Sequence, residues 1–187
     1  PGRIVLVQES YVNIDKLVTR GFDTTFRYRW TPVRAGNFRI SLMHTYLDEW
    51  KLTETADEMM LNWNVAGDKL HIPVPRNRAN LNISWYLDAH GAAANFHYTG
   101  SYENHTDLYV DGERTDQPMI IGSHTTLDLQ YTYNLQFSES EAVIALGAKN
   151  VFDEEPPRVY DGVNFSYDPK HHDPRGRMYY LRVKYAF

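Results

Sequence analysis

From residue 127 to residue 137 the chain alternates between apolar and polar residues without a break. Leu, Tyr or Phe stands at every odd position, and Asp, Gln, Thr or Asn stands at every even position. Successive side chains of an extended strand point to opposite faces, whereas residues on one face of a helix recur about every 3.6 positions. The alternation therefore predicts a β-strand with one apolar face and one polar face.

The same period of two recurs along the chain and predicts an all-β protein of antiparallel strands. It is also clear in 22–30, in 80–88 and in the last residues of the chain, and it is weaker elsewhere. No segment shows a helical period. We therefore predict eight strands, at 3–9, 22–30, 37–50, 80–88, 92–102, 125–137, 142–152 and 178–187.

The connections between these strands alternate in length. The short connections contain turn residues and lie at 31–36, 90–91 and 138–141. The long connections have about twenty residues each and lie at 53–75, 103–122 and 153–175. We therefore expect the turns at one end of the strands and the long loops at the other end.

The composition argues against several classes of protein. A net charge of −5 over 187 residues gives no basic surface for nucleic acid, and a chain of this length is expected to form one domain. The absence of cysteine excludes disulfide scaffolds and thiolate metal sites. No phosphate-binding glycine loop, nucleophile elbow or pair of catalytic carboxylates stands out. The sequence therefore predicts a protein that is not an enzyme.

Alternation alone fits both a soluble β-sandwich and a β-barrel in a membrane. Several predicted strands reach ten or more residues, which a tilted strand needs to cross a bilayer, whereas soluble strands average about 5 to 6. Strand length therefore favours the barrel, with its apolar face toward lipid. Aromatic residues near the strand ends would form belts at the two membrane interfaces, and the candidates are Tyr28, Trp30, Phe38, Trp85, Tyr133, Phe137, Tyr185 and Phe187.

The polar face of such a barrel would line its lumen. We expect its side chains to form hydrogen bonds with water, with a plug inside the barrel and with one another. They are Asp23, Arg27, Arg29, Asn82, Asp88, Asn95, His97, Asp128, Gln130, Asn134, Arg182 and Lys184.

The last forty residues contain two motifs that resemble a known family. The first is LGAKNVFDEEPP at 146–157, and the second is a Gly-Arg pair, Gly176 and Arg177, before a strand that ends in Phe187. Together they resemble the C-terminal signature of TonB-dependent outer-membrane receptors. The segment KLVTRGFDTTFRYRW at 16–30 also resembles a strand of that family.

The resemblance implies an antiparallel transmembrane β-barrel of about 22 strands with an N-terminal plug domain. Residues 1–187 would be the C-terminal portion of this barrel, about eight strands, without the plug and the earlier strands. In the family, the plug contacts the TonB complex through a short segment, the TonB box. Its members lie in the bacterial outer membrane and import a small-molecule or oligosaccharide cargo, such as a siderophore, cobalamin or haem.

The resemblance also gives the last strand a role. In outer-membrane barrels, the barrel-assembly machinery recognises a C-terminal strand that faces lipid and ends in Phe. This strand runs toward the periplasm, which makes the short turns periplasmic and the long loops extracellular. The implied assembly signal consists of Tyr179, Leu181, Val183, Tyr185 and Phe187.

Aromatic residues in the loops are the best candidates for binding cargo, because their rings stack on sugars and on aromatic chelates. They are Trp50, Trp63, Tyr109, Tyr160, Phe165 and Tyr167.

A group of metal-binding residue types occurs in the last long loop. His171, His172 and Asp173 are adjacent, and Asp161 and Asp168 lie nearby. Imidazole and carboxylate suit zinc and similar ions. Neighbouring histidines in an extended chain point to opposite sides, however, so we predict a solvated loop with no metal and no cofactor.

Two other interpretations fit the same pattern. One is a self-contained eight-stranded outer-membrane barrel that acts as a structural anchor or an adhesin, with its interior filled by side chains. The other is a soluble β-sandwich that binds sugars.

Overall fold

The computed structural model describes residues 16–56, 59–64, 74–104, 109–110, 113–114, 119–159 and 166–187. The predicted strand at 3–9 lies outside these residues. No helix of the described part of the chain is long and apolar enough to cross a membrane.

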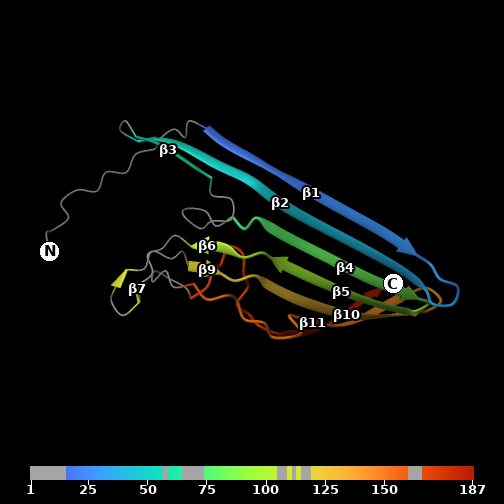
Figure 1. Ribbon diagram of the computed structural model, residues 1–187. Helices are drawn as coiled ribbons and strands as arrows, with labels where there is room; N and C mark the ends of the chain where they lie inside the picture. Colours follow the sequence, from blue (N-terminus) through green and yellow to red (C-terminus); the bar gives the residue numbers. More distant parts are fainter. Residues whose placement is uncertain are drawn as a thin grey trace.

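One antiparallel sheet of eight strands dominates the structure, which confirms the all-β prediction (Figure 1). β3 (Met59–Asn64) pairs with residues 51–56 of β2 and lies off the main path of the sheet. The main path runs through β1 (Lys16–Trp30), β2 (Asn37–Ala56), β4 (Asn77–Leu87), β5 (His90–Thr99), β10 (His124–Gln136), β11 (Glu141–Lys149) and β12 (Met178–Ala186).

Two of the predicted long loops contain strands of their own. Within 103–122, β6 (Tyr102–Asn104) pairs with β9 (Met119–Ile121). β7 (Tyr109–Val110) pairs with β8 (Glu113–Arg114) in the same region. Within 53–75, β2 continues to Ala56 and pairs with β3. The prediction of long loops was therefore wrong for parts of 53–75 and 103–122. Backbone hydrogen bonds can pair strands whose side chains do not alternate between apolar and polar.

The short turns and the long connections lie at opposite ends of the sheet, as predicted (Figure 1). The turns at 31–36, 88–89 and 137–140 lie at the end where the C-terminus also lies. We call this the turn end, and we call the end with β6, β7 and β9 the loop end. Gly36 closes the first turn with a φ of +84°, a conformation that favours glycine.

The register of the strands separates apolar residues from polar residues on the two faces of the sheet. Directly opposite residues of antiparallel strands share one face. A row across β1, β2, β4, β5 and β10 consists of Tyr28, Ile40, Ile83, Ala94 and Leu129. The adjacent row on the other face consists of Arg29, Arg39, Ser84, Ala93 and Gln130.

The buried apolar core is small and lies at the loop end. Tyr102, Ile121 and Val159 pack together there, and each is at most 3% exposed. On the apolar face of the sheet, by contrast, Phe26 is 53% exposed and Leu181 is 64% exposed. An exposed apolar surface that extends over a whole sheet indicates a partner surface or an apolar solvent.

The aromatic residues that we expected at two interfaces gather at the turn end. Trp30 and Phe38 flank the first turn, with ring centroids 5.3 Å apart. The rings of Tyr185 and Phe187 lie 6.1 Å apart at the C-terminus. The expectation of two belts from this set is wrong, because each member lies within a few residues of a short turn or the C-terminus.

Candidate functional site

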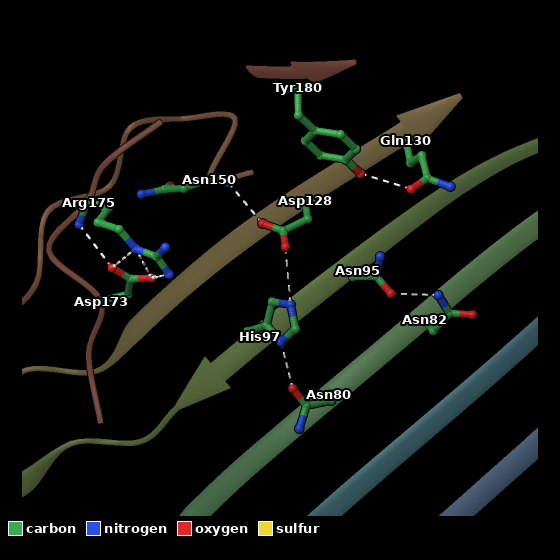
Figure 2. A network of polar contacts seen from close by, with 10 residues as sticks. All are labelled: Asn80, Asn82, Asn95, His97, Asp128, Gln130, Asn150, Asp173, Arg175 and Tyr180. Carbon is green, nitrogen blue, oxygen red and sulfur yellow. Dashed lines mark hydrogen bonds and ion pairs between the residues drawn. The ribbon is translucent and has the colours of Figure 1, made fainter. Parts of the chain in front are cut away.

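The polar face of the sheet carries connected side chains on β4, β5 and β10 (Figure 2). His97 Nδ1 lies 2.7 Å from Asn80 Oδ1, and His97 Nε2 lies 3.6 Å from Asp128 Oδ2. The other carboxylate oxygen of Asp128 accepts a hydrogen bond of 2.9 Å from the backbone N–H of Asn150. These contacts join three neighbouring strands to the end of β11.

Two further pairs lie on this face toward the turn end (Figure 2). Asn82 Nδ2 donates to Asn95 Oδ1 at 2.6 Å, and the Tyr180 hydroxyl donates to Gln130 Oε1 at 2.9 Å. Gly147 lies between Gln130 and Tyr180 in the register, and its missing side chain leaves room for the Tyr180 ring. The predicted contacts among the polar-face residues are therefore confirmed for Asn82 with Asn95 and for His97 with Asp128. Gln130 instead contacts Tyr180, which is not in the predicted set.

The two C-terminal motifs contact each other beyond the end of β11. Asn150 has a positive φ, and its side chain both donates to the backbone C=O of Glu154 and accepts from its N–H. Asp153 Oδ1 accepts the backbone N–H of Arg177 at 2.7 Å. The Arg177 guanidinium donates in turn to the C=O of Val151 at 3.2 Å. We call Asn150, Asp153, Gly176 and Arg177 the C-terminal clasp.

A buried hydrogen-bonded cluster fixes the last long loop to the loop end of the sheet. The Tyr102 hydroxyl of β6 donates to Asp168 Oδ2 at 2.7 Å and lies 3.3 Å from His172 Nε2. His172 Nδ1 lies 3.3 Å from Nδ1 of His124, the first residue of β10. We call Tyr102, His124, Asp168 and His172 the loop-base cluster, and each is at most 8% exposed.

Burial sets the protonation of the loop-base cluster. Burial, with His124 close by, lowers the pKa of His172 from 6.5 to about 4, so the imidazole is neutral at neutral pH. A neutral imidazole donates at one nitrogen and accepts at the other, which suits its two contacts. Burial also raises the pKa of Tyr102, and the hydrogen bond to Asp168 raises it further. Tyr102 therefore keeps its proton, and its hydroxyl donates a hydrogen bond to the Asp168 carboxylate.

The prediction of a solvated loop is wrong for part of 168–173. Asp168 and His172 are buried because Tyr102, which is distant in sequence, supplies a hydrogen-bond partner for both. Asp173 is exposed and pairs with Arg175. Asp161 lies outside the described residues. Among the described residues, no three His, Cys, Asp or Glu side chains are placed to hold a metal ion.

A cavity lies between the polar face and the last long loop, and we call it the polar-face cavity. Its volume is about 310 Å³. β4 and β5 contribute Arg78, Asn80 and His97 to its wall, and the last long loop contributes Asp173. The remaining wall is mostly polar. Its residues are Tyr98, Thr99, His124, Thr126, Asp128, Lys149, Asn150, His171, Gly176 and Met178.

The structure does not bring the predicted cargo-binding aromatics into one described site. Trp50 lies in β2, and Tyr167 precedes the buried Asp168 in the last loop. Trp63 and Tyr109 lie in β3 and β7, but their side chains are outside the described part. Tyr160 and Phe165 also lie outside the described residues.

Four of the five predicted assembly residues share the apolar face of β12, an edge strand of the sheet, and the fifth, Phe187, directly follows this strand. Their side chains are between 58% and 100% exposed, with Phe187 at the upper limit. Their opposite neighbours on β11 are apolar as well, for example Leu146 opposite Leu181 and Ile144 opposite Val183.

A family model described as TonB dependent receptor-like, beta-barrel matches residues 2–151 of the chain. Neither the curated proteins nor the solved structures contain a match. The matched region ends before Asp153, Gly176 and Arg177, so it does not rest on the complete C-terminal signature.

Proposed function

The chain belongs to the TonB-dependent receptor family of β-barrels, and on that basis we propose that it is the C-terminal part of an outer-membrane receptor wall. The whole receptor imports a scarce nutrient with energy from the TonB complex. The plug, its TonB box and the earlier strands precede this chain in the full-length protein. The receptor acts by binding and transport and carries out no chemical reaction on its cargo.

The observation that carries this proposal is the continuous separation of two faces across the sheet. Rows of apolar side chains cross β1, β2, β4, β5 and β10 in register, with polar rows between them on the other face. A bilayer satisfies an exposed apolar face, and a wide water-filled lumen satisfies the polar face. Large apolar side chains on this face stay exposed from β1 to β12, for example Phe26, Leu129 and Leu181, which argues against the soluble sandwich.

The orientation follows from the ends of the sheet. The turn end, with its short connections and Phe187, faces the periplasm, and the loop end faces the medium. Cargo therefore first meets the loops and the polar face beneath them. Aromatic residues such as Trp50 of β2 and Tyr167 of the last long loop contact a small molecule or an oligosaccharide. The exposed residues of β12 contact lipid after the barrel-assembly machinery has inserted the barrel.

Uptake by cells that carry the full-length gene tests this proposal. We would supply an iron siderophore, cobalamin, haem or a maltooligosaccharide as the limiting nutrient, in strains with and without TonB. Growth on one of them should require both the gene and TonB, and the protein should fractionate with the outer membrane. A protein found in a soluble fraction, or growth that is independent of TonB, would contradict the proposal.

A further inference from the structure

The polar-face cavity carries more unpaired positive charge than unpaired negative charge. Of its two carboxylates, Asp173 binds the Arg175 guanidinium through both oxygens. Asp128 accepts a backbone N–H at the end of β11 and lies 3.6 Å from His97, but it has no Lys or Arg partner among the described residues. Arg78 and Lys149 also line the cavity, and neither forms a hydrogen bond or an ion pair with another described residue. Two unpaired cations stand against the one carboxylate of Asp128, so the net charge available to a ligand is positive.

Both cations act electrostatically on groups near the cavity. Burial is the main reason for the low pKa of His172, and the positive charge of Arg78 lowers it further. The hydrogen bond from Arg175 is the main reason for the lowered pKa of Asp173, and Lys149 adds to it. Arg78 belongs to β4 and Lys149 ends β11, so the two charges reach the cavity from different strands.

His124 forms part of the cavity wall at the start of β10. Its Nδ1 contacts His172 of the loop-base cluster, and the residue is 8% exposed. The cavity is therefore bordered by the buried cluster on one side.

We propose that the polar-face cavity binds an anionic oxygen group, a carboxylate or a phosphate, between Arg78 and Lys149 and beside His124. A guanidinium matches the paired oxygens of either group, and an ammonium adds a point charge. The cavity volume of about 310 Å³ corresponds to about ten water molecules. It therefore holds the anionic group with a short scaffold. Only the source of the anion rests on the proposed function, and that source is either the cargo or an acidic side chain of the plug.

Thermal unfolding of the purified full-length receptor in detergent tests this inference. The probes are inorganic phosphate and citrate, each added against chloride at constant ionic strength so that general screening stays fixed. The test variant R78Q/K149Q removes both cavity cations. The control R182Q/K184Q removes the same charge from the polar face of β12, and R78K/K149R keeps the charge in the cavity.

An anion from outside should raise the Tm of the wild-type receptor by a few degrees in a saturable manner. R78Q/K149Q should abolish this rise, and R182Q/K184Q should keep it. An acidic side chain of the plug should give a different result: no rise with either probe, and a lower Tm in R78Q/K149Q that R78K/K149R restores.

The inference is overturned if neither probe shifts the Tm and R78Q/K149Q unfolds like the wild type. It is also overturned if a rise persists unchanged in R78Q/K149Q. The Tm measurement needs no nutrient and no TonB, so its outcome is separate from that of the uptake experiment.

Discussion

Gly176 combines a left-handed backbone conformation with a close contact in the C-terminal clasp. Its φ is +60°, and a Cβ at this position would lie 2.8 Å from Asp153 Oδ1. The same oxygen accepts the backbone N–H of Arg177. A side chain at 176 would therefore strain the backbone and disturb the hydrogen bond that fixes the start of β12.

Gly176→Ala in the full-length receptor should lower the free energy of unfolding by about 1 to 2 kcal/mol, the usual cost of a left-handed conformation for a residue with a Cβ. Denaturant titration measures this loss. The matched control is Gly122→Ala, where the added Cβ meets no atom within 4 Å and φ is not positive. Equal stability of the two variants would contradict the role given to Gly176.

Phe187 has a different role, because its side chain is 100% exposed and contributes little to packing within the chain. Deletion of Phe187 from the full-length receptor should reduce the amount in the outer membrane far more than the cargo affinity of each assembled molecule. Quantitative blotting of membranes and ligand titration measure the two effects. Normal abundance with lost binding would show that Phe187 is no assembly signal.

Among the larger elements, the last long loop depends on the loop-base cluster for its position. The folded pKa of His172, about 4, lies below its unfolded value of 6.5. The unfolded loop therefore binds more protons between these pH values. The stabilisation from neutral His172 is present above pH 6.5 and is lost as the pH falls toward 4. It amounts to at most about 3 kcal/mol.

Acidification from pH 7 to pH 4 should release the segment 166–177 from β6 and β10. Hydrogen exchange measures this release as lower amide protection, after correction for the intrinsic pH dependence of exchange. His172→Gln should lower protection already at pH 7. The control His90→Gln lies at the turn end and should behave like the wild type. Protection of 166–177 that stays constant across this range would contradict the account.

Strands could be predicted from sequence because their signal is local. The alternation at 127–137 separates the apolar and polar faces of β10 residue by residue, and the register continues both faces across β11 and β12. The hairpin of β2 and β3 was missed because 51–56 carries no alternation. The loop-base cluster was missed because Tyr102 and Asp168 are 66 residues apart, and nothing local in either segment indicates the other.

For the whole molecule, the described sheet is an open arc with β1 and β12 as its edges. An open edge leaves backbone N–H and C=O groups unpaired, and lipid offers no partner for them. The isolated 187-residue chain, refolded in detergent, should therefore aggregate or pair edge to edge. Light scattering measures its mass. A folded monomer with heat-modifiable mobility on a gel would instead indicate a closed eight-stranded barrel.

The central claim is that one face of this sheet meets lipid and the other meets water. The chain contains no cysteine, so single cysteines at 129, 130, 131 and 132 of β10 can be labelled without a background from this region. In the full-length receptor in outer membranes, a lipid-soluble quencher should reach fluorophores at 129 and 131. A water-soluble maleimide should react at 130 and 132. Accessibility without a period of two, or alternation with the two faces exchanged, would contradict the account.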